Sequence, residues 1–130
     1  MTKTLYKRKY EKERYNSDPD HKLRMNLRRS VRRVIIENRE SKRSKELLGC
    51  RTVKVRQHLE EQFDDGMSWD NYGKGSDCWN IDHIVPCTSF ELSKKTHQKK
   101  CFNYKNLQPM WHIDNIKKGN KIERSCITNS

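Results

Sequence analysis

Two short apolar runs followed by a Lys-rich segment constrain the fold of this chain more than any other feature. Residues 79–85 alternate enough to predict a β-strand, which Pro86 closes because proline lacks the N–H that a strand ladder needs. Residues 107–111 predict a second short strand or extended segment. A final helix is expected from about Asp114, with Gly119 limiting its length or marking its end. The order strand, strand, helix predicts an α+β domain.

Helical signals dominate the first half of the chain. Ser17-Asp18-Pro19 predicts a helix start, because a capping side chain precedes proline at the first helical position. This helix is expected to run to about Glu37. Its apolar residues recur at helical spacing and predict one buried face: Leu23, Leu27, Val31, Val34 and Ile35.

Shorter helices are expected in the middle of the chain. Ser44 is predicted to cap a short helical turn that Gly49 ends. Thr52 is a plausible cap for a second helix that runs to about Phe63. Residues 96–101 predict one further helical turn inside a long polar connection.

The excess positive charge lies entirely in the first half of the chain. Residues 1–58 carry 19 Lys and Arg against 7 Asp and Glu, whereas residues 59–130 carry 10 of each, so the net charge of +12 belongs to the first segment. This segregation indicates a surface for a polyanion, and a solvated basic arm without a partner is the alternative. DNA is the expected partner, bound through its phosphates with strong salt dependence.

Basic residues in two segments are the candidate DNA contacts. The first set occupies the polar surface of the N-terminal helix: Arg24, Arg28, Arg29, Arg32 and Arg33. The second set lies in the last predicted helix and consists of Lys117, Lys118 and Lys121, for which a solvated helix face is the alternative interpretation. Phosphate contacts of this kind position a protein on DNA without reading its sequence.

Length and composition predict one small domain with an arm. Only 32% of the 130 residues are hydrophobic and the mean hydropathy is −1.21, so the core must be small. We expect a basic, mainly helical DNA-binding arm over residues 1–43, a compact domain over 44–123 and a tail over 124–130. No apolar run of about 18 residues predicts a membrane span, and the N-terminus lacks a secretory signal. An intracellular location without a membrane partner is therefore expected.

The cysteines do not predict a zinc site. They are odd in number and widely spaced: Cys50, Cys78, Cys87, Cys101 and Cys126. No two of them have the C-x-x-C spacing of zinc knuckles, so no structural zinc is expected. Free thiols in a reducing compartment are the predicted state.

The Asp82-His83 pair inside the first predicted strand is the candidate catalytic feature. Histidine titrates near neutral pH and can take a proton from water, so His83 is the candidate general base, with a half-buried strand histidine as the alternative. Consecutive strand residues point to opposite faces. Either the strand twists or ends at this pair, or the two have distinct roles, with Asp82 for metal and His83 for water.

Oxygen donors for a hard cation follow in the sequence. Asn115 is the candidate second metal ligand through its amide oxygen, because Mg²⁺ binds carboxylate and carbonyl oxygens and keeps several waters. His112 or Asp114 could ligate instead. Asn106 is either a turn residue or a residue that fixes the loop and orients the imidazole of His83.

In their order and spacing these residues resemble the HNH endonucleases. His83, Asn106 and Asn115 follow the His-Asn-His/Asn pattern of that family, with Asn as the third letter. Residues 44–122 are also similar, string by string, to HNH proteins of phages and large viruses: LLGC at 47–50, HLEEQF at 58–63, GMSWDNYG at 66–73, WNIDHIVPCTSF at 79–90, CFNYKNLQPMW at 101–111 and DNIKKGNK at 114–121.

The resemblance implies a fold and a role for each residue. The expected fold is a small ββα-metal (HNH) motif, within residues 44–123, preceded by the basic helical region. The residue at His83 would activate water, those at Asp82 and Asn115 would bind one divalent metal ion, and the one at Asn106 would shape the site. The expected ion is Mg²⁺, with Mn²⁺ or another divalent ion as alternatives.

The implied activity is metal-dependent hydrolysis of DNA phosphodiester bonds, by nicking or by double-strand cleavage. One such site cuts one strand, so a homodimer is a possibility where both strands are cut. The alternative is a catalytically silent DNA-binding or packaging accessory protein that keeps the HNH fold.

Overall fold

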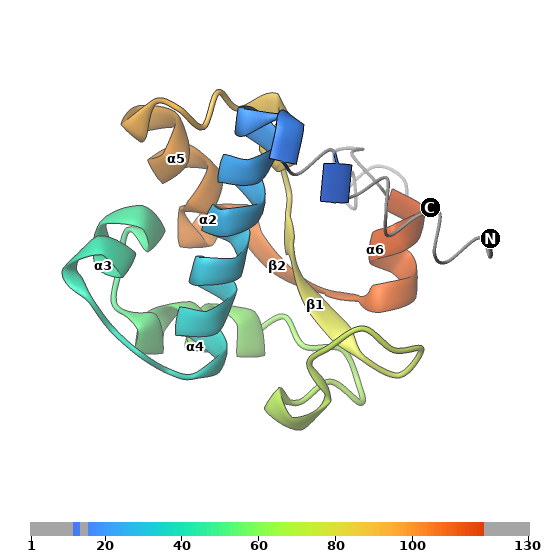
Figure 1. Cartoon of the computed structure of the whole chain (residues 1–130). Helices are drawn as coiled ribbons and strands as arrows, with labels where there is room; N and C mark the ends of the chain where they lie inside the picture. Colours follow the sequence, from blue (N-terminus) through green and yellow to red (C-terminus); the bar gives the residue numbers. More distant parts are fainter. Residues whose placement is uncertain (1–11, 14–15, 119–130) are drawn as a thin grey trace, which may run out of the picture.

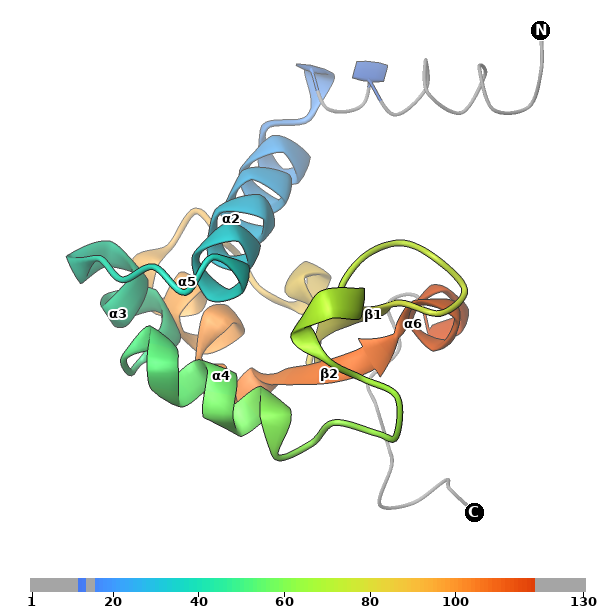
Figure 2. The ribbon, with the colours of Figure 1, turned by 90° about the horizontal axis from the view of Figure 1, so that it is seen from below.

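Two antiparallel strands divide the helices into two groups (Figure 1). The computed structural model describes residues 12–13 and 16–118, and within them the architecture is mostly helical α+β. The helices are α2 (Pro19–Ile36), α3 (Lys42–Leu48), α4 (Thr52–Glu60), α5 (Lys95–Phe102) and α6 (His112–Lys118), and the strands are β1 (Trp79–His83) and β2 (Leu107–Trp111). Figure 2 shows α2 to α5 gathered on one side of the strands and α6 on the other.

Helix α2 confirms the predicted N-terminal helix. The Asp18 side chain accepts hydrogen bonds from the N–H groups of Asp20 and His21, and Pro19 occupies the first turn. These contacts satisfy N–H groups that have no partner within the helix. The helix ends at Ile36, one residue before the predicted end, and Leu27, Val31 and Ile35 form its buried face.

Helix α3 corrects the predicted cap. Ser41, not Ser44, is the capping residue, and the helix begins at Lys42. Ser44 is the third helical residue, and its side chain accepts a hydrogen bond from the Ser41 N–H, so the two serines form a capping box. In the sequence, Ser41 and Ser44 are equally suitable as the capping residue. The reciprocal hydrogen bonds in the structure identify Ser41 as the cap. Gly49 ends the helix with a left-handed φ of 78°, as predicted.

The remaining boundaries differ from the predictions by a few residues. Thr52 is the first residue of α4 and not its cap, because Arg51 occupies the cap position; the Thr52 hydroxyl donates to the Arg39 carbonyl. The helix ends at Glu60, three residues before the predicted end. The predicted turn at 96–101 belongs to the longer α5, β1 ends two residues earlier than predicted, and α6 follows β2 directly at His112.

One hydrophobic core joins α2 to the rest of the chain. Its buried residues are Leu27, Val31, Ile35, Leu47, Leu48, Val55, Leu59, Cys87, Leu92, Cys101, Phe102 and Leu107. Trp79 is fully buried in an adjacent aromatic cluster with Phe63, Trp69 and Tyr72. In the described part of the chain, no helix is long and apolar enough to cross a membrane.

The strand pairing positions the candidate site. Strand β1 pairs with β2 in the register Trp79 to Trp111 and His83 to Leu107. The chain then turns directly into α6, which packs against both strands. The C-terminal end of β1 therefore lies beside the N-terminal end of β2 and the C-terminal end of α6. In the sequence, a long connection that contains α5 separates β1 from β2 and α6.

Candidate functional site

The alternation of β1 sends Asp82 and His83 to opposite faces. Asp82 contacts Lys118 of α6, whereas the ring of His83 contacts Phe102 of α5 with a centroid separation of 5.0 Å. The two side chains therefore point to opposite faces, as side-chain alternation along a strand predicts, and β1 ends at His83.

Asp82 is a buried carboxylate that is paired with a lysine. Only 7% of Asp82 is exposed, and its Oδ2 accepts from Nζ of Lys118 at 2.6 Å and from Nε2 of Gln108 at 3.0 Å. The same Nζ donates to the carbonyl oxygen of His83 at 2.7 Å. Lys118, predicted as a DNA contact, thus lies inside the protein, where two oxygen atoms hold its ammonium group.

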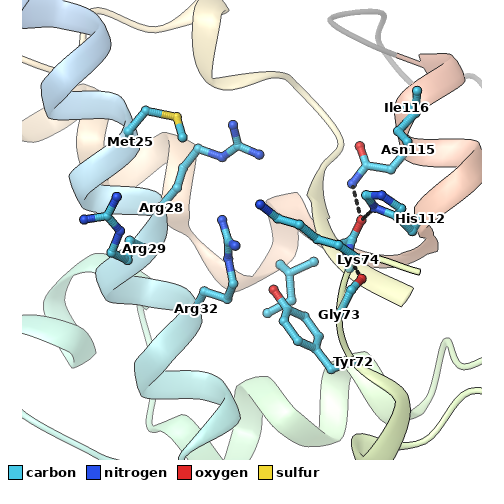
Figure 3. A pocket seen from close by; sticks show the side chains of 12 residues that line it. Met25, Arg28, Arg29, Arg32, Tyr72, Gly73, Lys74, His112, Asn115 and Ile116 are labelled. Atoms are coloured by element: carbon cyan, nitrogen blue, oxygen red, sulfur yellow. Dashed lines mark hydrogen bonds between the residues drawn. The ribbon is translucent and has the colours of Figure 1, made fainter. Parts of the chain in front are cut away.

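Asn115 belongs to a polar group on the same interface. Its Nδ2 donates to Oδ1 of Asn80 at 3.4 Å, and Nδ1 of His112 donates to the same oxygen at 2.7 Å. In Figure 3 the amide oxygen of Asn115 points away from the dashed hydrogen bond that its Nδ2 makes. Asn115 and Asp82 therefore share the interface between α6 and β1, but each is held by a different partner. Asp114, the other alternative ligand, is exposed.

His83 is buried beside a small cavity. The residue is 8% exposed, and its Nε2 has no hydrogen-bond partner among the described residues. A cavity of about 10 Å³ borders the ring and is lined by Arg28, Val31, Arg32, Ile81, His83, Phe102 and Leu107. A single water molecule needs about this volume.

Asn106 joins three chain segments through its side chain. Its Oδ1 accepts from the N–H of Val85 at 2.9 Å, and its Nδ2 donates to the carbonyls of Val85 at 3.1 Å and Cys101 at 2.8 Å. Its own carbonyl accepts from the N–H of Ile84. The amide thus holds the loop that follows His83, which agrees with the predicted loop-fixing role.

Replacing Asn106 by alanine is expected to destabilise the protein by about 2–3 kcal/mol, because its three side-chain hydrogen bonds disappear and backbone groups of Val85 and Cys101 stay unpaired. Urea unfolding measures this change. Asn103→Ala is the matched control, since that side chain makes one exposed local bond to Lys105 and its removal costs about 1 kcal/mol or less. Equal destabilisation in the two variants would contradict the bridging role.

A basic cleft lies between α2 and the polar group on α6 (Figure 3). Its volume is about 400 Å³, and its lining residues are Met25, Arg28, Arg29, Arg32, Tyr72, Gly73, Lys74, Asn80, Ile81, His112, Asn115 and Ile116. Four of these described residues are cations and none is a carboxylate. Such a surface attracts phosphate groups. Burial raises the pKa of Tyr72 above its ordinary value, and nearby Arg32 opposes the rise.

The predicted DNA contacts occupy several places. Arg28, Arg29 and Arg32 line the cleft, whereas Arg33 lies outside its lining. Arg24 borders a separate hollow with Asp20 and residues 88–92, and Lys117 is exposed on α6. Lys121 lies outside the described residues.

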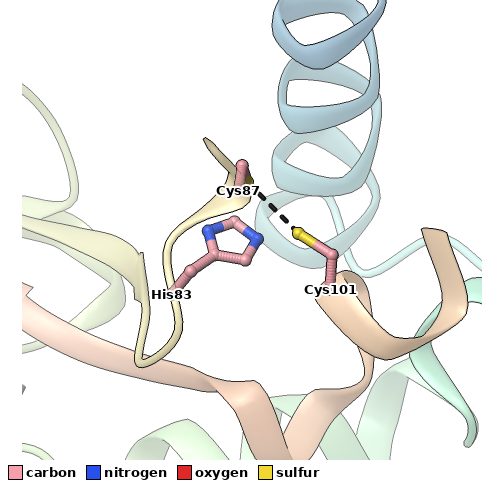
Figure 4. Close-up of side chains that lie close together, drawn as sticks. All are labelled: His83, Cys87 and Cys101. Atoms are coloured by element: carbon pink, nitrogen blue, oxygen red, sulfur yellow. Dashed lines mark hydrogen bonds between the residues drawn. The ribbon is translucent and has the colours of Figure 1, made fainter. Parts of the chain in front are cut away.

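Two cysteines come together next to His83, which the sequence spacing did not indicate. Sγ of Cys101 lies 3.3 Å from Sγ of Cys87, although 14 residues separate them. Figure 4 shows the imidazole of His83 close to both sulfur atoms. The hydrogen bond from Cys101 lowers the pKa of the Cys87 thiol to about 5, with a further contribution from His83. The same bond, together with burial, raises the pKa of Cys101.

Asn80 is the other site residue that sequence reasoning missed. It lies two positions before Asp82 and hence on the same face of β1, where it contacts both His112 and Asn115. The period of two along a strand is a signal that could have identified it. For the cysteines no local signal exists, because their contact depends on how α5 packs beside the loop after β1.

These features define a mostly helical α+β protein with a polar site between a strand and the helix that follows the strand pair. The chain is related to two proteins of Acanthamoeba polyphaga mimivirus, uncharacterized protein L426 and uncharacterized protein L246. It is 38% identical to L426 over 112 residues, which cover 86% of this chain and 48% of the relative. It is 34% identical to L246 over 127 residues, covering 89% and 54%.

The chain thus spans about half the length of the curated relatives it matches. No protein-family model matches the chain. No solved structure matches it either.

Proposed function

We propose that this protein is a metal-dependent endonuclease of the HNH type that hydrolyses DNA phosphodiester bonds. The observation that carries the proposal is the packing of α6 across β1. It puts Asp82 and Asn115 on one interface, next to a cleft whose wall carries Arg28, Arg29 and Arg32. A ββα unit with oxygen donors beside a phosphate-attracting surface has the parts for one-metal hydrolysis.

The donor set suits a hard divalent cation such as Mg²⁺. Asp82 offers a buried carboxylate, and Asn115 offers an amide oxygen that points away from the hydrogen bond of its own Nδ2. The Asp82 carboxylate and the carbonyl oxygen of His83 already bind one positive charge, the ammonium group of Lys118. This supports the proposal that the position favours a cation. When bound, the metal ion supplies stabilisation of the negative charge that develops on the scissile phosphate.

His83 is the general base of the proposed reaction. Its Nε2 has no hydrogen-bond partner among the described residues, and the residue lines a cavity with room for one water molecule. Nε2 takes a proton from this water while the water oxygen forms a bond to phosphorus, and the bond from phosphorus to the 3′-oxygen breaks. Arg28 and Arg32 line both this cavity and the cleft, so they position the phosphate near the base.

Plasmid nicking tests the proposal directly. Supercoiled plasmid is incubated with the protein and Mg²⁺ or Mn²⁺, and relaxed and linear products are separated on a gel. We expect nicked product in either metal and none in EDTA. Asn115→Ala is expected to lose cleavage and to keep its DNA affinity. A wild-type protein that binds DNA but nicks it with no divalent metal would falsify the enzymatic proposal.

The alternative function is a DNA-binding protein without catalysis. Two observations favour it: Lys118 neutralises Asp82, and the imidazole of His83 faces two thiols instead of the open cleft. In that case no nicked plasmid forms with any divalent metal, while DNA binding through the cleft remains.

The double substitution of Arg28 and Arg32 by alanine is expected to weaken DNA binding and to reduce its salt dependence. For every phosphate that is no longer neutralised, the slope of log K against log salt becomes shallower by about 0.9. Fluorescence anisotropy with a labelled duplex at several salt concentrations measures both quantities. Arg33→Ala is the control on the same helix, because this residue lies outside the cleft lining. An unchanged slope in the double variant argues against the cleft as the DNA surface.

A further inference from the structure

Three metal-ligating side chains from three chain segments meet inside the protein. His83 ends β1, Cys87 follows Pro86 in the next loop, and Cys101 lies in the last turn of α5. One ligand atom from each lies within 4.8 Å of the other two, and all three residues are buried (Figure 4). Nε2 of His83 is one of two buried side-chain polar atoms in the described residues without a hydrogen-bond partner.

We propose that His83, Cys87 and Cys101 form a binding site for a thiophilic cation, Zn²⁺, distinct from the oxygen-donor site at Asp82 and Asn115. Thiolate and imidazole are the ligands that Zn²⁺ prefers, and three protein ligands with one further position form a known type of zinc site.

The geometry needs only small adjustments to hold the ion. With Zn–S bonds of about 2.3 Å and Zn–N bonds of about 2.0 Å, tetrahedral ligand atoms lie about 3.5–3.8 Å apart. The two sulfurs, at 3.3 Å, must separate slightly. Since all three ligand atoms lie within 4.8 Å of one another, no pair needs to close by more than about 1 Å. Two thiolates also cancel the charge of the ion, so the loaded site stays neutral in its buried position.

Asn106 preorganises these ligands. Its side chain bonds to the carbonyl of Cys101 and to both backbone groups of Val85, which lies between His83 and Cys87. Residues outside the ligand set that fix the backbone in this way strengthen a metal site.

A metal ion accounts for the arrangement better than a disulfide between the cysteines. A disulfide brings the sulfurs to about 2.05 Å and requires an oxidant. It also leaves Nε2 of His83 buried without a partner. A zinc ion engages all three side chains at once.

The site also predicts regulation, and this step rests on the proposed function. The lone pair on Nε2 cannot accept a proton from water while it binds a metal ion. Zn²⁺ at this site therefore inhibits the nuclease, whereas Mg²⁺ at the oxygen donors supports it. The two cations act on opposite faces of β1.

Cobalt binding tests the site on the wild-type chain without reference to activity. Co²⁺ is titrated into the protein under a non-thiol reductant, and the absorbance is recorded. We expect one equivalent to produce a thiolate-to-cobalt charge-transfer band, which one equivalent of Zn²⁺ removes. The band is expected to vanish in the Cys87→Ser, Cys101→Ser double variant and to persist in Cys50→Ser, whose thiol lies outside the group. No band in the wild type, or a band that survives the double substitution, overturns the site.

A second assay tests the inhibition. One equivalent of Zn²⁺ is expected to lower Mg²⁺-dependent nicking by about tenfold or more, because the base is no longer free. The double serine variant should keep its nicking in the presence of Zn²⁺. Equal inhibition of both proteins overturns the regulatory role. If neither protein nicks DNA, the nuclease proposal fails. The cobalt spectrum still shows whether His83, Cys87 and Cys101 bind a metal ion.

Discussion

Replacing His83 by alanine is expected to lower the rate of Mg²⁺-dependent plasmid nicking by about 10²–10⁴-fold, the usual contribution of a positioned general base. The reason lies in the surroundings of the imidazole: its Nε2 is buried and has no partner among the described residues, and His83 lines a cavity of about 10 Å³. Alanine cannot take the proton from a water in this cavity. DNA affinity should hardly change, because the cations of the cleft remain.

The control separates catalysis from folding. His97→Ala removes an imidazole that bonds to the backbone of Glu91 and packs on Phe90, outside the proposed site. This variant should nick DNA at the wild-type rate. Circular dichroism and a thermal melt of His83→Ala show whether removal of the ring that packs on Phe102 disrupts the fold. A folded His83→Ala protein with wild-type nicking would remove His83 from the mechanism.

Replacing Lys118 by methionine is expected to destabilise the metal-free protein by about 3–5 kcal/mol, the usual cost of leaving one member of a buried ion pair alone. The side chains of Asp82 and Lys118 are only 9% and 6% exposed, so water cannot stabilise the negative charge of the carboxylate once the lysine is gone. The variant should then respond to metal. Mg²⁺ or Mn²⁺ at Asp82 replaces the missing positive charge, and binding to the folded state alone stabilises it.

Chemical unfolding in EDTA and in excess Mg²⁺ measures both effects. Lys117→Met is the matched control, because this neighbouring lysine is exposed and its substitution is expected to change stability by about 0.5 kcal/mol or less. The double variant Asp82→Asn, Lys118→Met should recover much of the stability and no longer respond to Mg²⁺. A Lys118→Met protein that Mg²⁺ does not stabilise counts against a metal ion at Asp82.

Local rules predicted much of the fold. Asp18 and Pro19 marked the start of α2, and the stripe through Leu27 and Val31 marked its buried face. The strand at β1, the segment at β2 and the helix after them were predicted in the right order. Such signals act over a few residues, through backbone donors and side-chain periodicity, so a sequence carries them directly.

The site was only partly predictable for a physical reason. Strand alternation indicated that Asp82 and His83 face different ways, and Asn106 has the predicted loop contacts. The pairing of Lys118 with Asp82 depends on how α6 docks across β1. The meeting of Cys87 and Cys101 depends on how α5 packs. Docking angles of this kind are set by the whole core and leave no short-range pattern.

The alternation of β1 has a consequence for how this protein can change. Strand β1 separates two groups of possible metal ligands: the oxygen donors Asp82 and Asn115 lie on one face, and the thiols of Cys87 and Cys101 lie on the other. Its register is held by the buried ring of Trp79 and by the bond from Asn80 to the carbonyl of Gly73. An insertion of one residue after Trp79 turns Asp82 toward the thiols and His83 toward Lys118. Length variation among relatives should therefore fall in the flanking loops and spare residues 79–83.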